Sequence, residues 1–350
     1  MSPSSPSIVL YVGAAGSNAI SVLTLDGAAG RLTPTQTARF DGVDQVGPST
    51  PLAVSPDRRF LFAGVRAEPY QVVTFAIEPK TGALTQVGLG PLPDSLAYLS
   101  TDRTGRFLFG ASYGGSQVAV SPIGPNGRVG AALQCLATGP NAHAILPSPD
   151  NRFLLATNLG SDEICVFRFD ASSGVLTPSR PPTVKTGLSS GPRHLAFHPN
   201  APLAFLLGER DAVVRSFAYD AAVGRLTELC GASAMPPGAP GQAPLKPWGA
   251  DIHLTPDGRF LYVSERTTSS LVGFSVDPSS GVLTLIEATP TEKQPRGFGI
   301  DPTGRFLAAV GELSDSLTLY AIDQKSGRLA PLQSVPVGTS PNWVEFIRLG

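Results

Sequence analysis

Pro256-Asp-Gly-Arg-Phe-Leu-Tyr-Val263 and Asp277-Pro-Ser-Ser-Gly-Val-Leu-Thr284 are two phrases that recur along this chain of 350 residues. Variants of the first phrase begin at Pro56, Arg103, Pro149, Pro199 and Pro302. Turns related to the second phrase end at seven glycines, roughly 45 to 57 residues apart: Gly30, Gly82, Gly127, Gly174, Gly224, Gly281 and Gly327. Strand-rich repeats of about 40–50 residues are typical of a β-propeller, in which each repeat is one blade. Seven copies predict seven blades.

The repeat that contains both phrases predicts four short strands. They cover residues 252–254, 260–263, 271–276 and 283–287, and they are separated by turns that carry Gly and Asp. Aromatic and β-branched residues in such runs favour strands, and tight turns between them favour antiparallel pairing. We therefore predict an all-β chain, a seven-bladed β-propeller with four antiparallel strands per blade.

The two ends of the chain predict how the ring closes. Residues 341–347 resemble a first strand that nothing follows, and residues 8–12 resemble a second strand that nothing precedes. Pairing them in one blade would close the ring and remove two exposed sheet edges. We expect residues 8–350 to form a single propeller domain and residues 1–7 to be a disordered tail.

Composition and charge argue against several classes of function. Charged residues make up only 15% of the chain, the net charge is −1 and the pI is near 6.4, which gives no support for binding to nucleic acid or to a membrane surface. No apolar run approaches the roughly 18 residues of a membrane span, and residues 1–7 do not read as a signal peptide. The three cysteines lack CxxC spacing, so we expect buried thiols in a reducing compartment. A cytoplasmic monomer or weak homodimer is the expectation.

Strand order predicts which face of the ring carries function. In an antiparallel blade, the turns between strands 1 and 2 and between strands 3 and 4 lie on one face. The loops between strands 2 and 3, and the connections to the next blade, lie on the other. The first face carries the repetitive turns, where one residue type predicts a repeated structural contact: Arg106, Arg152, Arg259 and Arg305. The varied residues, and hence a site, belong to the second face.

Two equivalent positions on that second face hold unlike residues in different blades. The position at the start of the first strand holds Thr50, His143, Arg193, Ala250 and Arg296. The position in the loop after the second strand holds Arg66, Tyr113, Glu209, Arg266 and Glu312. Seven of these ten residues are charged or His, so we expect a pocket of mixed charge around the central axis. The alternative is a set of solvated loop residues.

The remaining histidines and the motifs predict neither a metal nor a cofactor. Strand alternation predicts that His194 points away from Arg193, where it could support the site from behind. His253, in mid-strand, suits either a packed or a site role, and His198 lies in a turn of the structural face. No His pair has the spacing of metal ligands, and the chain lacks GxSxG, a P-loop and a helix-opening GxGxxG.

Several stretches resemble the seven-bladed propeller lactonase family, which includes bacterial 6-phosphogluconolactonases and a fungal carboxy-muconate lactonising enzyme. The stretches are Pro140-Asn-Ala-His-Ala144, Gly191-Pro-Arg-His-Leu-Ala-Phe-His-Pro199, Gly208-Glu209, Gly258-Arg-Phe-Leu-Tyr-Val-Ser-Glu-Arg266, Ala111-Ser-Tyr-Gly-Gly115 and Leu159-Gly-Ser-Asp162. The resemblance implies four catalytic residues, His143, Arg193, Glu209 and Arg266. We expect six further residues to contact substrate: Arg296, Tyr113, His194, Asp251, Glu312 and Arg66. Glu265 and Asn158 depart from the usual family residues, which moves charge around the predicted pocket rim.

Hydrolysis of a lactone needs a base for water, donors for the oxyanion and a proton for the leaving oxygen. We expect Glu209 or His143 to be the base, and arginines keep a carboxylate ionised, which favours His143. Arg193 and Arg266 would bind the carbonyl and an anionic group, and Arg296 would add a phosphate or carboxylate ligand. The expected substrate is 6-phosphogluconolactone. Lactone formation or isomerisation, an unphosphorylated aldonolactone and a non-catalytic scaffold remain alternatives. The Pro-rich segment 231–247 would be either a wall of the pocket or a passive loop.

Overall fold

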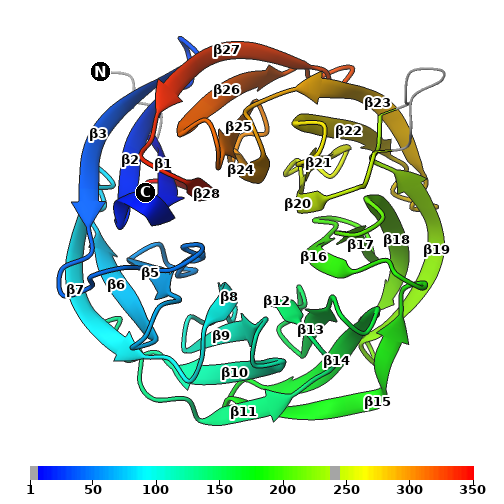
Figure 1. The fold of residues 1–350 in the computed structure, drawn as a ribbon. Helices are drawn as coiled ribbons and strands as arrows, with labels where there is room; N and C mark the ends of the chain where they lie inside the picture. The colour runs from blue at the N-terminus through cyan, green and yellow to red at the C-terminus, as the bar shows by residue number, and fades with distance from the viewer. Residues whose placement is uncertain (1–6, 237–244) are drawn as a thin grey trace.

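The computed structural model of the chain describes residues 7–236 and 245–350, which form seven four-stranded antiparallel sheets arranged as a ring (Figure 1). The innermost strands, around the axis, are β28 (Pro341–Arg348), β4 (Leu52–Val54), β8 (Leu96–Thr101), β12 (Ala142–Pro147), β16 (Pro192–Phe197), β20 (Gly249–Leu254) and β24 (Pro295–Ile300). The second strands are β1 (Ile8–Ala14), β5 (Phe60–Val65), β9 (Phe107–Ser112), β13 (Phe153–Asn158), β17 (Leu203–Gly208), β21 (Phe260–Glu265) and β25 (Phe306–Gly311).

The third and fourth strands lie progressively further from the axis (Figure 1). The third strands are β2 (Ala19–Asp26), β6 (Gln71–Ile77), β10 (Gln117–Pro122), β14 (Glu163–Asp170), β18 (Val213–Asp220), β22 (Ser270–Val276) and β26 (Ser316–Ile322). The outermost are β3 (Arg31–Arg39), β7 (Leu84–Pro91), β11 (Gln134–Ala137), β15 (Val175–Lys185), β19 (Arg225–Ser233), β23 (Leu283–Pro290) and β27 (Leu329–Pro336). A short 3₁₀ helix, Ala15–Ser17, joins β1 to β2. The predicted seven-bladed propeller is confirmed.

The ring closes as the sequence predicts. β1 pairs antiparallel with β28, from Ile8 opposite Arg348 to Ala14 opposite Pro341. The two ends of the chain therefore complete one sheet, in which β28 is the innermost strand (Figure 1). This pairing removes the two free strand edges that an open ring would expose. The tail prediction for residues 1–6 lies outside the described residues.

The hydrophobic core lies between blades rather than within them. Every residue of the second strands β5, β9, β13, β17, β21 and β25 is buried, because both faces of these strands pack against a neighbouring sheet. Each apolar cluster joins two adjacent blades, as where Val9 and Tyr11 of β1 pack with Leu61 and Phe75 of the next blade. A single blade has no such partner, so apolar burial and ring closure depend on each other.

The repeated turns act as contacts between blades, as predicted. Arg152 lies over the Phe153 ring and donates to the carbonyl oxygens of Ala221 and Ala222 in the next blade. Arg106 makes the equivalent contacts with Phe107 and with the turn at Ser172. These bonds join strand 1–2 turns to strand 3–4 turns. Both kinds of turn therefore lie on one face, which leaves the other face for the site.

The Asp-x-x-x-Gly turns need their glycines for backbone geometry. Gly174 has φ of 80° and Gly281 has φ of 73°, a left-handed conformation that favours glycine. A Cβ atom at Gly174 would also collide with the ring of Phe107 in the preceding blade. The glycine repeat therefore marks both a turn and a close contact between blades.

The cysteine prediction is wrong for one residue. Cys165 in β14 is buried and Cys230 in β19 is half-buried, whereas Cys135 is exposed because it lies in the outermost strand β11. All three are free thiols. In the part of the chain that the structure describes, no helix has the length and apolar character to cross a membrane.

Candidate active site

The predicted site residues of the innermost strands are the extra residues of β-bulges. In β12, Ala142 pairs with Asn158 and Ala144 with Thr157, so His143 between them has no partner. The same shift leaves Arg193 unpaired in β16 and Arg296 unpaired in β24. A bulge bends the strand and changes the direction of its side chain. In these three blades the repeat therefore turns one side chain out of the regular ladder at the same end of the ring.

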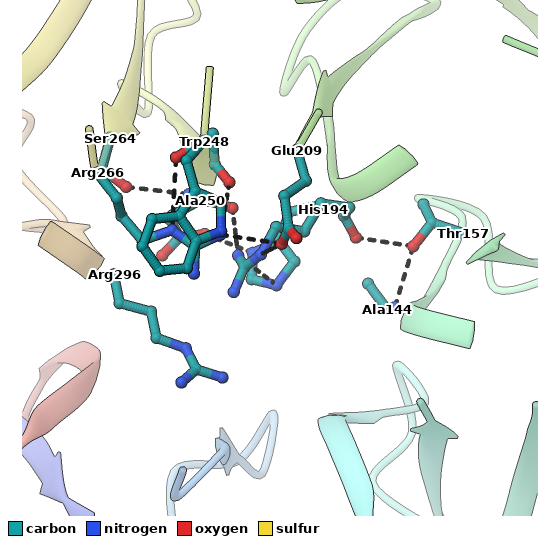
Figure 2. A network of polar contacts seen from close by, with 12 residues as sticks. Ala144, Thr157, His194, Glu209, Trp248, Ala250, Ser264, Arg266 and Arg296 are labelled. Carbon is teal, nitrogen blue, oxygen red and sulfur yellow. Dashed lines mark hydrogen bonds and ion pairs between the residues drawn. The ribbon is translucent and has the colours of Figure 1, made fainter. Parts of the chain in front are cut away.

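A buried hydroxyl connects two of these bulges. Thr157 Oγ1 accepts a hydrogen bond from the Ala144 N–H at 3.0 Å and donates one to the Arg193 carbonyl oxygen at 2.7 Å (Figure 2). Thr157 is fully buried in β13, and Arg193 belongs to the next blade. Ser264 Oγ supports the following bulge by accepting from the Asp251 N–H at 3.0 Å. Single hydroxyls thus fix the backbone next to His143 and at Arg193.

Glu209 is the centre of an ion-pair cluster. Its Oε2 accepts a bond from Arg193 Nε at 3.0 Å and another from Arg266 Nη2 at 2.9 Å. Glu209 lies in the loop after β17 and Arg266 lies in the loop after β21, so three segments of two neighbouring blades meet here (Figure 2). The exposed side-chain fraction is 3% for Arg193 and 5% for Arg266, so both guanidinium groups are desolvated.

Backbone carbonyl groups and an indole ring hold the two arginines in place. Arg193 Nη1 donates to the Ala250 carbonyl, and Arg266 Nη2 donates to the Gly249 carbonyl at 3.0 Å. The Arg266 guanidinium carbon lies 3.9 Å from the centre of the Trp248 ring (Figure 2). Stacking on the indole stabilises the cation and restricts its rotation.

The charges of the cluster persist at neutral pH. Burial raises the pKa of Glu209, but attraction to Arg193 and Arg266 outweighs burial, and the net shift is downward. Burial and the charge of Arg193 lower the pKa of Arg266 to about 9, and Glu209 partly offsets them. Glu209 is therefore a carboxylate and both arginines are cations, as the sequence predicts.

His194 has its two ring nitrogens occupied. Nε2 lies 3.2 Å from Arg193 Nη1, and Nδ1 lies 2.7 Å from Asp251 Oδ1. Arginine can only donate, so Nε2 accepts and the proton is on Nδ1, facing Asp251. Burial, followed by the charge of Arg193, lowers the pKa of His194 to about 4. His194 is a neutral imidazole that orients Arg193.

His143, next to this cluster, has a free ring nitrogen. Its Nδ1 is buried and has no hydrogen-bond partner among the described residues. Its ring centre lies 5.2 Å from that of His194 and 6.0 Å from that of Tyr113. Burial, followed by the positive charge of Arg193, holds the pKa of His143 well below 6.5. The imidazole is therefore neutral and can accept a proton.

A second group of charges comes from β24 and from the loops after β5 and β25. Arg296 Nη1 donates to Glu312 Oε1 at 2.8 Å and to the Pro48 carbonyl oxygen at 3.4 Å. Arg66 Nη1 donates to Ser49 Oγ at 2.6 Å. In Figure 2 the Arg296 guanidinium points into the open centre, apart from Arg266 and Glu209. The structure thus divides the predicted residues into two clusters.

Two expectations about side chains need correction. His194 contacts Arg193 instead of pointing away from it, because the bulge at Arg193 interrupts strand alternation. Glu265 is fully buried and does not lie on the pocket rim. Its carboxylate accepts bonds from the Trp248 N–H at 2.8 Å and the Thr268 N–H at 2.7 Å, so its role is structural.

Asp251 lies behind the site and not at its surface. Its Oδ1 is held by His194 and its Oδ2 lies 3.2 Å from His253 Nε2. Burial raises the pKa of Asp251, but the two histidines outweigh it and the net shift is downward. Both carboxylate oxygens are thereby engaged, which suits an orienting role, and the expected contact with substrate stays a prediction.

Sequence reasoning did not find Thr157, Ser264 or Trp248. The two hydroxyl residues are ordinary strand residues in the sequence, and only the spatial position of the bulges shows what they bind. Trp248 follows the Pro-rich segment directly, and one of two tryptophans next to a predicted site is a signal that was available.

A cavity of about 400 Å³ opens beside Glu209 and is lined by Glu209, Arg210, Lys246, Pro247, Trp248 and Thr267. The end of the Pro-rich segment therefore does border a cavity. Its first residues, 231–233, are the end of β19, and residues 237–244 lie outside the described part of the chain. Within the described residues, no group of three or more His, Cys, Asp or Glu could share a metal ion.

Known proteins are similar to this chain in sequence and in architecture. The family described as lactonase, 7-bladed beta-propeller, matches residues 9–346. The 6-phosphogluconolactonase of Pectobacterium carotovorum is 42% identical over 293 residues, 84% of each chain. That of Serratia proteamaculans is 41% identical, over 84% of this chain and 85% of the relative. The solved periplasmic gluconolactonase of Pseudomonas aeruginosa is 31% identical, with a TM-score of 0.87 over 98% of this chain and 100% of that chain.

Proposed function

Because this chain belongs to the seven-bladed β-propeller lactonase family, we propose that it hydrolyses a sugar-acid lactone, with 6-phosphogluconolactone as substrate. The observation that carries this proposal is the convergence of Arg193 and Arg266 on Glu209 beside a neutral histidine. Fixed cationic donors next to an uncharged base are what water attack on an ester carbonyl requires.

His143 is the base that best fits the reaction. It takes a proton from water as the water oxygen attacks the lactone carbonyl carbon, and it returns a proton to the ring oxygen when the ester bond breaks. Glu209 is a poorer base, because its Oε2 already accepts bonds from two cations that hold its pKa down. Proton transfer of this kind contributes roughly 10²- to 10⁴-fold to a rate.

Arg193 and Arg266 are suited to bind the negative charge that develops on the carbonyl oxygen. They are held before substrate arrives, by Glu209, by backbone carbonyl groups and by Trp248. No reorientation is then needed during the reaction, and donors of this kind contribute on the order of 10²- to 10³-fold each. His194 and Asp251 support Arg193 from behind.

An unphosphorylated aldonolactone is the second candidate substrate. It is favoured by the likeness to the Pseudomonas gluconolactonase, which covers nearly all of both chains. The three cysteines are free thiols, which suits a reducing compartment and supports a cytoplasmic location. A cytoplasmic location favours 6-phosphogluconolactone over the unphosphorylated aldonolactone.

A panel of lactones tests the proposed function. Release of acid from 6-phosphogluconolactone, glucono-δ-lactone and a muconolactone is followed in a pH-stat at mildly acidic pH, where spontaneous opening is slow. Hydrolysis of 6-phosphogluconolactone well above the background, and faster than of the other two, is expected. No acceleration for any lactone would contradict a lactonase, and preference for the unphosphorylated sugar would support the second candidate.

A further inference from the structure

Two arginines from different blades meet at one short segment. The segment is Pro48-Ser49, just before β4, and each of its two residues accepts a hydrogen bond from one of the arginines. Arg296 Nη1 donates to the Pro48 carbonyl oxygen at 3.4 Å, and Arg66 Nη1 donates to Ser49 Oγ at 2.6 Å. Arg66 Nε also donates to Ser95 Oγ, at 3.2 Å. The two side chains come from blades on either side of the closing blade and are fixed side by side.

The described residues balance the charge of this pair only in part. Among the described residues, Arg296 has one ion-pair partner, Glu312, and Arg66 has none. Burial, followed by the positive charges of Arg296 and Arg193, lowers the pKa of Arg66 to about 10. Glu312 is the one carboxylate in ion-pair contact with these two arginines among the described residues, and Asp94 attracts Arg66 only from beyond ion-pair distance, so the two cations still repel each other. An anion bound here would relieve that repulsion.

Both arginines keep donors that nothing in the described structure uses. Arg66 is bonded through Nε and Nη1, and Arg296 through Nη1 alone. Arg66 Nη2 and the Nε and Nη2 atoms of Arg296 are therefore available to a ligand. Guanidinium donors in a fixed fork match the oxygens of a phosphate group.

We propose that Arg66 and Arg296, joined through Pro48 and Ser49, are the phosphoryl subsite of the lactone site. The assignment rests on the proposed function and orients the substrate. The carbonyl group would lie with His143, Arg193 and Arg266, and the phosphoryl group, which C6 carries on the other side of the ring oxygen, would lie with Arg66 and Arg296. Figure 2 shows this separation between Arg296 and the cluster around Glu209.

The competing position for a phosphate is the cavity beside Glu209, where Arg210 and Lys246 are exposed. Both side chains are exposed, whereas hydrogen bonds hold Arg66 and Arg296 in place. A phosphate that binds a flexible side chain must restrict it, which costs conformational entropy. Arg66 and Arg296 have already lost that entropy in the free protein. Arg210 therefore provides a matched control for Arg66.

The test compares Arg66→Gln, Arg66→Lys and Arg210→Gln with the wild type on 6-phosphogluconolactone and glucono-δ-lactone. The ratio of the two kcat/KM values measures phosphate recognition. We expect Arg66→Gln to lower the ratio on the order of 10- to 100-fold. Arg66→Lys, which keeps the charge and loses the fork, should lower it less. Arg210→Gln should change it by less than about threefold. An unchanged ratio in Arg66→Gln, or the large loss in Arg210→Gln, overturns the proposal.

Calorimetric titration with 6-phosphogluconate and with gluconate separates this proposal from the proposed function. We expect Arg66→Gln to weaken binding of the phosphorylated acid on the order of 10- to 100-fold and to leave a folded protein by thermal melting. If the wild type hydrolyses no lactone but binding of 6-phosphogluconate still depends on Arg66, the proposed function fails and the subsite stands. Equal binding of 6-phosphogluconate by wild type and variants removes the subsite, whatever the activity.

Discussion

Thr157 and Arg193 are joined across a blade boundary by a hydrogen bond of 2.7 Å from the Thr157 hydroxyl to the Arg193 carbonyl oxygen. The same hydroxyl accepts the N–H of Ala144, the residue after His143. One buried side chain therefore fixes the relative positions of the base and of an oxyanion donor that lie in different blades. Such positioning matters because a displacement of about 1 Å can cost on the order of 100-fold in rate.

The change Thr157→Val removes this hydroxyl and keeps the shape of the side chain. We expect kcat to fall on the order of 10- to 100-fold, with a smaller change in KM, because the reacting groups lose their alignment. Thr157→Ser should restore most of the activity. Steady-state kinetics of the three proteins measure the effect.

Thr74→Val is the matched control for that change. Thr74 is also buried, and its hydroxyl also bonds to a backbone carbonyl of the next blade, that of Gly127 at 3.0 Å, but far from the site. Both valine variants should lose about 1 kcal/mol of unfolding free energy. If Thr74→Val lowers kcat as much as Thr157→Val does, the effect is one of stability and not of positioning.

Replacing Glu209 with Gln removes the anion shared by Arg193 and Arg266. We expect activity to fall steeply and unfolding free energy at neutral pH to fall by up to about 3 kcal/mol, since two buried cations lose their partner. Denaturant unfolding measures the loss.

The pH dependence of that loss has a definite sign. The folded-state pKa of Glu209 lies below its ordinary value of 4.5, so its charge stabilises the fold above that pH. The stabilisation is lost as pH falls through the lowered pKa. The difference between wild type and Glu209→Gln should therefore shrink on acidification, and a difference that grows would contradict the ion-pair account.

His143 sets the acid limb of the pH profile. Burial and nearby arginines hold its pKa well below 6.5, so the neutral base persists into mildly acidic solution. We expect kcat/KM to stay level as the pH falls through 6.5 and to decline only well below it. His143→Asn should lower kcat by roughly 10²- to 10⁴-fold. A decline centred near 6.5 would indicate an ordinary, solvated histidine instead.

Glu265 supports the Arg266 loop from below. Its carboxylate accepts N–H groups of Trp248, Thr267 and Thr268. Glu265→Ala should leave these donors unsatisfied, at about 1–3 kcal/mol each, and release Trp248 from Arg266. We expect a lower melting temperature and a weaker quenching of Trp248 fluorescence by the guanidinium. Unchanged melting would show that water replaces the carboxylate.

The sequence predicts the ring well because its turns are local features that recur. Two glycines, Gly174 and Gly281, indicate turns with a left-handed backbone conformation. Two arginines, Arg106 and Arg152, indicate contacts with the next blade. Equivalent positions in the repeat also predict that His143, Arg193, Glu209 and Arg266 face one end of the axis. That much depends only on strand order.

Contacts between blades could not be read in the same way. The bond from Thr157 to Arg193 and the approach of Arg296 to Pro48 join residues 36 and 248 positions apart, and they exist only in the closed ring. The contact between Arg193 and His194 depends on a bulge that strand alternation does not predict. Glutamate is usually a surface residue, so the sequence does not show that Glu265 is buried and binds backbone N–H groups.

A crystal structure with bound 6-phosphogluconate, the product of the proposed reaction, tests the central claim most directly. The account predicts the carboxylate of the acid within hydrogen-bond distance of Arg193 and Arg266, near His143, and the phosphate on Arg66 and Arg296. Product bound on the opposite face of the ring, or at the mouth of the axis with no contact to Arg193, Arg266 or His143, would contradict it.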